Sequence, residues 1–556
     1  MPADDKAVIL LRRLKSLEEA RSTWEAHWQE IADFMRPRKA DITKKRTPGQ
    51  KRTEQMFDGT AIHAAEMLAA SLHGMLTSMA TPWFSLRFTD PFLNDDDIAK
   101  EWLESAEQAM LQAFHRSNFQ EQVHEMYDDL VCFGTAIMFV ESDPDTSYRF
   151  STRHIAECFV SEDAQGRVDT VYRKFRLSAR AAVKQFGDDI TERIEREDRA
   201  DPYKLMEIIH VVLPRDDRDN TKKDRSNKPW ASIYIDPEEK VILGESGYDE
   251  MPYVVPRWLK SSTELGFGHS PAMACLADTK MLNKMSEITI RAAEKQIDPP
   301  LMVPDDGFML PVRTVPSGLN FYRSGTRDRI EPLNIGANQP LGLAMEDQRR
   351  QAIRSAFYVD QLIMSQNQTM TATEVIQRTE EKMRLLGPVL GRLQAEFLQP
   401  LIERTFNILS REKALPAPPE FMADFDIEIE YVSPIAKAQR SGEVQSIVRM
   451  LEMLAPLQQL EPGITDWIDF DGLAKHAIRV LGIPAAVVRG REEVEMIRAQ
   501  RQQAQQAEQE QMQAMQMAEA AGKAAPAVKA VGDMADMPVE GEVPEGAEII
   551  PGPGAA

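Results

Sequence analysis

The sequence predicts an α-rich α+β protein that is divided into several domains. With 556 residues and an ordinary hydrophobic content of 43%, the chain is long enough for about three or four domains. Apolar residues recur three and four apart through most of its length, which is typical of amphipathic helices. One stretch, from Tyr148 to Tyr253, instead alternates apolar and polar residues between turn signals, which indicates antiparallel strands.

Composition excludes some broad classes of protein. The net charge is −22, which argues against tight non-specific DNA binding by the surface as a whole. No run of about 18 apolar residues exists, so we expect no membrane-spanning helix. The three cysteines, Cys132, Cys158 and Cys275, are far apart and odd in number, which favours buried free thiols in a reducing compartment.

The N-terminal part is expected to be mainly helical. Residues 5–35 form an amphipathic pattern that Pro37 ends,. The basic stretch 36–52 is either a solvated loop or a contact for DNA or for an acidic neighbouring subunit. Helices are also expected over 60–80 and over 95–130, the latter with a break near residues 116–118, and a strand over 81–91,.

The passage 131–141 leads from these helices into the β-rich stretch, and Gly134 is expected to allow a close backbone approach there,. Within that stretch, Ser178 can cap a short helix that Gly187 ends,.

A pair of helices with an insertion between them follows. Pro271 suits the first turn of a helix that runs to Ile297 and stops at Asp298-Pro299-Pro300,. A Pro- and Gly-rich insertion then leads to a second helix over 338–364. Three arginines of that helix are spaced for one side, and salt bridges between subunits are a better interpretation than DNA contacts. They are Arg349, Arg350 and Arg354.

The most informative stretch is a long helix with an uncharged segment before it. The polar segment 365–369 precedes Thr371 and Glu374, which have the spacing of a capping box,. Gly387-Pro388 and Pro400 are expected to kink the helix, which would span ~60 Å if it were continuous. One apolar stripe runs along it: Leu386, Leu390, Leu393, Phe397 and Leu401,.

The rest of the chain is expected to hold a linker with one alternating strand over 413–432 and helices over 433–520,. The last stretch, 521–556, is acidic and rich in Pro and Gly, so we expect it to be disordered.

These motifs resemble the portal, or head-to-tail connector, proteins of short-tailed bacteriophages. The resemblance is carried by MTATEV and LGPVLGRLQAEFLQPLIERTF in the long helix, by GHSPA and DPPLMVP around 268–304, and by MRPRKA, FDGTA and TPWFSL near the start. It covers most of residues 5–490. The resemblance implies an N-terminal α/β wing region (1–265), first stem helix (266–297), clip (298–337), second stem helix (338–364), tunnel loop and long kinked helix (365–412), linker and strand returning to the wing (413–432), C-terminal helical crown (433–520) and tail (521–556).

The resemblance also implies a function. Portal proteins form a usually twelve-fold ring around a DNA channel at the head–tail vertex of the virion, for DNA packaging, retention and ejection and for tail attachment. The partners implied are copies of the chain itself, double-stranded DNA, the packaging motor ATPase (terminase), major capsid and scaffold proteins and a tail adaptor, without a membrane; assembly would take place in the host cytoplasm. The tunnel loop would be Gln366, Asn367, Gln368 and Thr369. A channel that lets DNA slide benefits from repelling phosphate, which fits the acidic chain.

No catalytic motif is present. The sequence has no phosphate-binding loop, nucleophile elbow, paired CxxC or H-E-x-x-H, and Gly266-x-Gly268 lacks the rest of a nucleotide fingerprint,. His63 with His73, and His124-Glu125, lack metal-ligand spacing,. We therefore expect no enzyme, cofactor or metal, and a separate motor for ATP. The alternative is a helical oligomeric scaffold or adaptor protein of the virion without a DNA channel; an enzyme ranks third.

Overall fold

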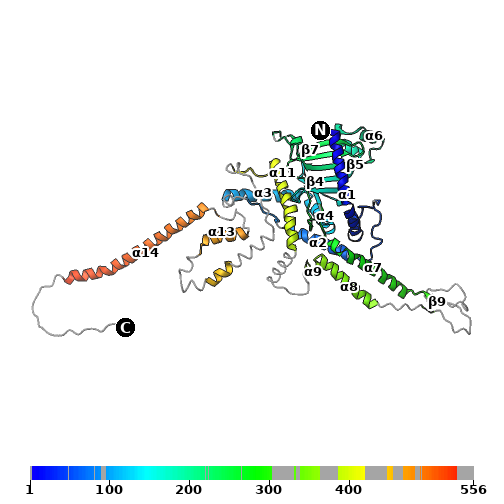
Figure 1. Ribbon diagram of the computed structural model, residues 1–556. Helices are drawn as coiled ribbons and strands as arrows, with labels where there is room; N and C mark the ends of the chain where they lie inside the picture. The colour runs from blue at the N-terminus through cyan, green and yellow to red at the C-terminus, as the bar shows by residue number, and fades with distance from the viewer. Residues whose placement is uncertain are drawn as a thin grey trace, which may run out of the picture. The chain divides into compact units, whose positions relative to one another are not determined.

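The computed structural model describes residues 3–44, 46–47, 49–80, 82–88, 96–219, 221–222, 224–263, 266–302, 331–332, 339–362, 386–419, 447–454, 468–481, 489 and 491–534. The chain forms two compact units, Met1–Gly482 and Ile483–Ala556, and each is described by itself. The first unit combines helices with antiparallel sheets (Figure 1), which confirms the predicted α+β class.

Four helices form the N-terminal part of the first unit, and they end close to where the sequence predicts. Gly134 stops the last of them in a left-handed conformation, with φ of 75°. The predicted strand over 81–91 is wrong for residues 82–87, which are extended without a ladder. Phe84, Leu86 and Phe88 are buried while Ser85 and Arg87 are only half-buried, so the alternation that predicts a strand is present. Residues 82–87 nevertheless pair with no strand in the described part of the chain. The helices are α1 (Ala3–Met35), α2 (Thr60–Leu76), α3 (Asp97–Arg116) and α4 (Phe119–Phe133).

Two antiparallel sheets follow. The larger has the order β3-β4-β5-β6-β7, and its neighbours along the chain pair directly. The smaller has the order β2-β1-β8. The strands are β1 (Ile137–Asp143), β2 (Ser147–Arg153), β3 (Cys158–Glu162), β4 (Val168–Ser178), β5 (Leu205–Pro214), β6 (Trp230–Asp236), β7 (Val241–Tyr248) and β8 (Tyr253–Val254).

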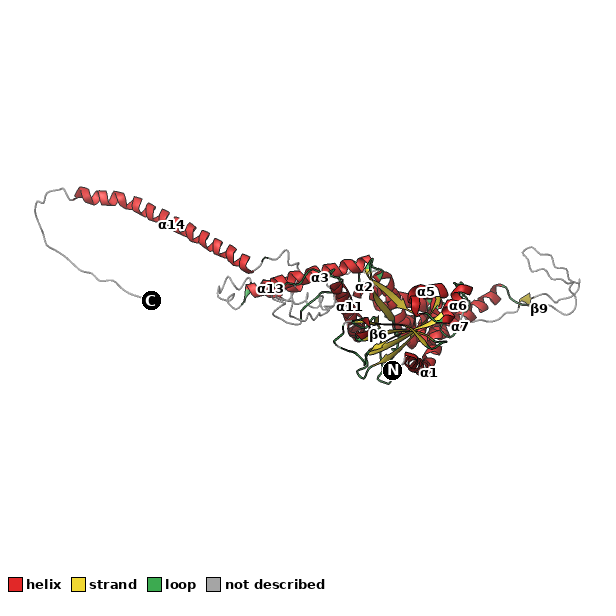
Figure 2. Cartoon of the chain, turned by 90° about the horizontal axis from the view of Figure 1, so that it is seen from above, coloured by secondary structure: helices red, strands yellow, loops and turns green. Residues whose placement is uncertain are grey.

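Helices cover both faces of the larger sheet. Along β5, Ile209 and Val211 pack with Leu10 and neighbouring residues of α1, whereas Met206 and Ile208 pack with α5 (Ala179–Phe186) and α6 (Glu192–Ala200). This alternation is the period of two expected of a strand buried on both sides. Figure 2 shows α1 on one side of the sheet and α5 with α6 on the other.

The paired helices lie as the sequence predicts, with one difference in the second. The first, α7 (Pro271–Ile297), begins at Pro271 and ends at Ile297 as predicted, and Ser270 accepts a hydrogen bond from the Met273 N–H at 3.0 Å. The second is divided into α8 (Gln339–Ala356) and α9 (Val359–Leu362), because Tyr358 takes a left-handed φ of 57° between them. Helices α7 and α8 lie side by side (Figure 1). At the far end of α7, β9 (Leu301–Met302) pairs with β10 (Glu331–Pro332).

Residues 386–411 are helical throughout, but their hydrogen bonding changes midway. An α-helical segment over 386–393 leads into a π-helical turn, Gln394–Leu398, and then into α11 (Gln399–Arg411). Pro400 lies in the first turn of α11. A proline cannot donate to the preceding turn and crowds it, and the wider π turn accommodates this. The predicted irregularity at Pro400 therefore takes the form of a π turn. The predicted strand within 413–432 lies outside the described residues.

The remaining described elements are helical. Residues 447–454 and α13 (Phe470–Leu481) belong to the first unit. The second unit contains α14 (Arg491–Met534). This helix extends beyond residue 520, so the expectation of disorder from 521 is wrong up to Met534. The reason is the alanine-rich composition of 518–530, because alanine has the highest helix propensity.

Candidate functional site: the attachment of the 386–411 helix

The structure describes the second half of the long helix but not the segment before it. Gln366, Asn367, Gln368, Thr369, Thr371 and Glu374 lie outside the described residues. Gly387 and Pro388 are exposed within the helical segment 386–393. The candidate site that can be described is therefore the attachment that holds this helix to the rest of the first unit.

The apolar stripe predicted for this helix is confirmed. All five of its residues are buried, with at most 7% of any one of them exposed. They belong to the main hydrophobic core, where the Phe397 ring meets the Tyr127 ring of α4 at 5.9 Å between centroids, edge to face. Burial of such a stripe is the main source of attachment energy for a helix.

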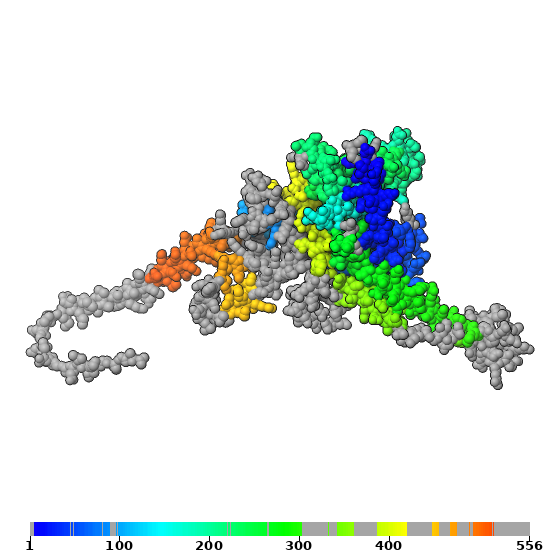
Figure 3. Space-filling model, viewed as in Figure 1, coloured from blue at the N-terminus to red at the C-terminus, as the bar shows by residue number. Residues whose placement is uncertain are grey.

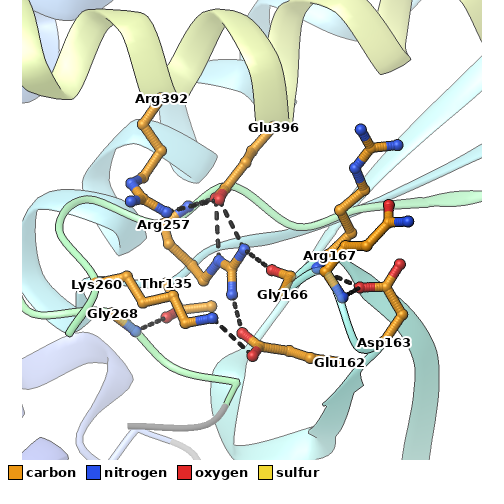
Figure 4. A network of polar contacts seen from close by, with 11 residues as sticks. Thr135, Glu162, Asp163, Gly166, Arg167, Arg257, Lys260, Gly268, Arg392 and Glu396 are labelled. Carbon is orange, nitrogen blue, oxygen red and sulfur yellow. Dashed lines mark hydrogen bonds and ion pairs between the residues drawn. The ribbon is translucent and has the colours of Figure 1, made fainter. Parts of the chain in front are cut away.

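Polar contacts add a specific attachment around Arg257 (Figure 4). Glu396, in the π turn, accepts hydrogen bonds from Arg257 Nε at 3.0 Å and Nη2 at 2.7 Å, and also from the Arg257 backbone N–H at 3.0 Å. This two-pronged pairing of guanidinium and carboxylate fixes direction as well as distance. The Arg257 side chain is only 2% exposed, so the pairing is weakly screened by water.

The other side of Arg257 is joined to the hairpin between β3 and β4. Its Nη1 donates to Glu162, and its Nη2 donates to the Gly166 carbonyl at 2.9 Å. Lys260 also pairs with Glu162, at 2.7 Å, and Arg392 pairs with Glu396 at 2.8 Å. We call Arg257, Lys260, Arg392, Glu162 and Glu396 the Arg257 network. It connects the helix to the larger sheet through ion pairs between three cations and two carboxylates.

Two glycines bring Arg257 into place. A Cβ on Gly268 would lie 2.6 Å from the Gly134 carbonyl oxygen and 3.0 Å from Arg257 Cβ. The Gly134 carbonyl accepts from the Trp258 N–H at 2.9 Å, and Thr135 Oγ1 accepts from the Gly268 N–H at 2.8 Å. The close approach expected at Gly134 is thus confirmed. Only residues without a side chain allow these backbones to meet.

A second polar attachment lies along α11. Arg404 donates to the Val140 carbonyl from Nε at 3.0 Å and Nη2 at 2.8 Å, and to the Glu250 carbonyl at 3.1 Å. Burial lowers the pKa of Arg404 to about 10, so the side chain remains charged at neutral pH. Arg411 pairs with Glu250 as well, at 2.5 Å. The helix is therefore held at several points along its length.

Two of the three arginines predicted on the second paired helix have partners within their own chain. Arg349 pairs with Asp278 of α7 at 2.8 Å. Arg350 pairs with Asp58 at 3.1 Å and with Glu346 at 3.0 Å. Burial raises the pKa of Asp58, but hydrogen bonds from Thr60 and Arg350 outweigh it and lower the pKa below its ordinary value. Arg354 is exposed. The predicted role of these arginines between subunits stays a prediction.

Helices α7 and α8 also carry large apolar side chains on their surfaces. Ile288 is 56% exposed and Ile297 is 86% exposed. Exposed apolar residues are normal singly, and this helix pair carries several of them,. The set comprises Met281, Ile288, Ile290 and Ile297 of α7 and Leu343 and Met345 of α8.

Other chemistry is limited in the part of the chain that the structure describes. No group of three or more His, Cys, Asp or Glu residues there is arranged to hold a metal ion. None of the helices described is long and apolar enough to cross a membrane. Burial raises the pKa of each thiol, of Cys132, Cys158 and Cys275, to about 12, so these cysteines are protonated and unreactive.

Comparison with known proteins identifies the family. Residues 9–488 match the family model described as "Bacteriophage head to tail connecting protein". The chain belongs to this family. A "Probable portal protein" of Bordetella phage BPP-1 is 34% identical over 506 residues, which cover 89% of this chain and 90% of that protein. The "Portal protein" of Salmonella phage epsilon15 is 32% identical over 503 residues, 88% of this chain and 90% of that protein.

A likeness to a solved structure is much weaker. A chain from the virion of a native gene transfer agent particle covers 73% of this head-to-tail connecting protein and 91% of its own length, with 12% identity and a TM-score of 0.34.

The Arg257 network was not predicted from the sequence. Arg257 and its two glutamate partners are separated by 95 and 139 residues along the chain, and no motif surrounds them. The only available signal was Gly134, which indicated a close approach without indicating what would meet there.

Proposed function

We propose that this head-to-tail connecting protein is a portal subunit. Many copies would close into a ring, usually twelve-fold, around a DNA channel at the head–tail vertex, where the genome is packaged, retained and ejected and the tail attaches. The observation that carries the proposal is the match of about nine tenths of this chain to two phage proteins named as portal proteins.

Exposed apolar side chains support assembly into a ring. Ile288, Ile297 and the other exposed apolar residues of α7 and α8 would be covered by a neighbouring copy,. When two different faces of the same chain bind each other, each copy is related to the next by a fixed rotation. Copies joined in this way form a closed ring if that rotation divides a full turn evenly. Arg354, which is exposed on α8, would be available for a salt bridge across it, with Arg349 and Arg350 nearby.

The regions of the subunit would follow the usual portal plan. The two sheets with α1 to α6 would form the wing, α7 and α8 with α9 the stem, and residues 298–337 the clip that faces the tail adaptor. Residues 413–432 would return the chain to the wing. Residues 433–520 would form a helical crown inside the head.

The attachment of the 386–411 helix would serve the channel. Residues Gln366 to Thr369 precede this helix in the sequence and would form the tunnel loop. A helix held by a buried stripe and by the Arg257 network can keep such a loop at a fixed radius while DNA moves past it. The uncharged loop can hydrogen-bond to phosphate without forming ion pairs that would hold the DNA in place. The acidic chain would also repel DNA rather than bind it.

The remaining partners would be supplied by the assembly. A separate motor ATPase, the terminase, would do the work of packaging, since we expect no catalysis and no cofactor from this chain. Major capsid and scaffold proteins would surround the ring, and a tail adaptor would bind it. The protein would reside in the virion after assembly in the host cytoplasm.

Electron microscopy and mass measurement of the purified protein test this proposal. We expect ring-shaped particles with a central opening about as wide as duplex DNA, and a mass that is a whole multiple of the 62.8 kDa chain. A helical scaffold or adaptor without a channel would give particles that have no central opening. Either that result or a protein that stays monomeric under all assembly conditions would overturn the portal assignment.

A further inference from the structure

A strongly basic segment lies in an otherwise acidic chain. Residues 36–52 contain eight Lys and Arg residues and one Asp, whereas the whole chain has a net charge of −22. A charge run of this kind is often a mobile, solvated loop. The structure gives a different result, because most of this segment is fixed to the helices beneath it.

Gln29 organises the segment from below. This side chain, on α1, is only 4% exposed. Its Oε1 accepts hydrogen bonds from three successive backbone N–H groups, those of residues 42, 43 and 44, at 3.1, 2.9 and 3.2 Å. Its Nε2 donates to the Ala40 carbonyl at 2.7 Å. One buried amide thus satisfies four backbone groups, and the loop has a defined path.

Ion pairs hold further cations of the segment in position. Asp33 of α1 is shared by Lys44, at 2.9 Å, and Arg46, at 3.1 Å. Arg52 pairs with Asp41 and donates to the Arg38 carbonyl at 3.0 Å. Since one carboxylate serves two cations, a positive charge remains uncompensated at Asp33.

Among the residues of the segment that the structure describes, three cations are exposed to solvent. Lys44 is 59% exposed despite its ion pair, and Arg38 and Lys51 are exposed too. We call these three side chains the basic surface. The residues that follow this segment contact α7. Asn283 of α7 donates to the Gln55 carbonyl at 2.8 Å and accepts from the Phe57 N–H at 2.7 Å. Figure 3 shows this blue part of the chain at the surface, next to the green α7.

We propose that the basic surface docks on an acidic surface of the neighbouring copy of this chain in the ring. This inference rests on the proposed ring assembly. Copies that each carry a charge of −22 repel one another, and a basic surface beside α7 offsets that repulsion where two copies meet. The residues that follow the basic segment also contact α7 through Asn283, and α7 carries exposed apolar residues that a neighbouring copy would cover.

DNA is the less favourable occupant. Lys and Arg side chains bind phosphate by releasing counterions. With three of these side chains per copy, the number of phosphate contacts would grow with the number of copies in the ring. A channel lined in this way would hold DNA tightly rather than let it slide. Pairing of the basic surface with an acidic protein surface would not slow the movement of DNA. The chain has 88 Asp and Glu residues that could provide such a surface.

Charge reversal tests the contact. The variant Arg38→Glu/Lys44→Glu/Lys51→Glu should weaken ring assembly by about two- to fivefold for each reversed charge, and hence by about eightfold or more in total, while circular dichroism remains that of the wild type. The matched control is Arg199→Glu/Lys204→Glu/Lys222→Glu, which changes the net charge equally at cations that are 75%, 52% and 65% exposed. Sedimentation over a range of salt concentrations measures both.

Zero-length amine–carboxylate crosslinking of wild-type rings tests the contact without a mutation. Rings mixed from ¹⁵N-labelled and unlabelled chains should give crosslinks from Lys44 and Lys51 to Asp or Glu of a neighbouring copy. The link from Lys44 to Asp33 of its own chain is the internal control.

Each outcome supports or overturns the inference. Crosslinks between copies together with weak assembly of the first variant alone support it. Rings that form equally well in both variants, without such crosslinks, overturn it and leave the portal assignment intact. Normal rings in the first variant with reduced binding of a DNA duplex would assign the basic surface to DNA instead. A wild-type chain that forms no ring would overturn this inference and the portal assignment together.

Discussion

Replacement of Glu396 by alanine should loosen the 386–411 helix selectively. In the wild type, this carboxylate accepts three hydrogen bonds from Arg257 and one from Arg392, at 2.7–3.0 Å. In Glu396→Ala, the Arg257 guanidinium stays buried, with 2% of its side chain exposed, and loses its two-pronged partner. Breaking a buried ion pair from one side typically costs about 3–5 kcal/mol.

We expect the low end of that range, about 3 kcal/mol, for two reasons. Glu396 is itself 18% exposed, and Arg257 keeps Glu162 and the Gly166 carbonyl as partners. If the loss falls on local opening of the helix, 3 kcal/mol corresponds to amide hydrogen exchange that is faster by about two orders of magnitude.

Hydrogen exchange followed by mass spectrometry measures this effect on peptides from 393–411 and from the hairpin at 162–167. The matched control is Glu403→Ala on the same helix, where an exposed carboxylate accepts from Gln399 at 2.9 Å. That change should cost no more than about 0.5 kcal/mol, or about a twofold change in rate. If both variants exchange alike in these peptides, the Arg257 network does not hold the helix.

Three further predictions concern other parts of the chain. His154 accepts a hydrogen bond from the Ala156 N–H at Nδ1 and contacts the Lys39 carbonyl through Nε2. Burial, and to a smaller extent the positive charge of Lys39, lower the pKa of His154 from 6.5 to about 4. Stability should therefore fall by up to about 3 kcal/mol as the pH drops from 6.5 towards 4, and His154→Gln should flatten that part of the unfolding profile; an unchanged slope would contradict this. Gly268→Ala should prevent correct folding, whereas Gly391→Ala, whose Cβ would meet nothing within 4 Å, should stabilise the helix by about 0.5–1 kcal/mol in thermal unfolding. Gln366→Lys/Gln368→Lys should slow DNA passage in a packaging assay, and normal packaging by that variant would refute the sliding argument.

Periodicity predicted the helices that bury one clear stripe. It placed α7 to its last residue, the break between α3 and α4, and the stripe from Leu386 to Leu401, because each depends on local spacing alone. It missed α6, where Ile194 is the one buried residue among charged neighbours, because a short, almost wholly charged segment is easily taken for a solvated loop. It also predicted a strand over 82–87, where the alternation of buried residues from Phe84 is present but no described strand pairs with the segment.

The attachment of the long helix could not be predicted, for a different reason. Arg257, Glu162 and Glu396 are charged residues that look like surface positions in the sequence, and only the fold brings them together. The break at Tyr358 depends on one left-handed residue, and tyrosine gives no sign of that conformation. The tunnel loop and the partners remain predictions that rest on the family resemblance, because no local pattern indicates them.

The central claim is that copies of this chain encircle a passage for DNA, with the segment before the 386–411 helix at its narrowest point. An electron cryo-microscopy reconstruction of the assembled protein tests it most directly. The account predicts a closed ring in which residues 365–371 of every copy border the central opening. A ring that carries these residues on its outer rim, or a particle with no axis of rotation through an opening, would contradict it.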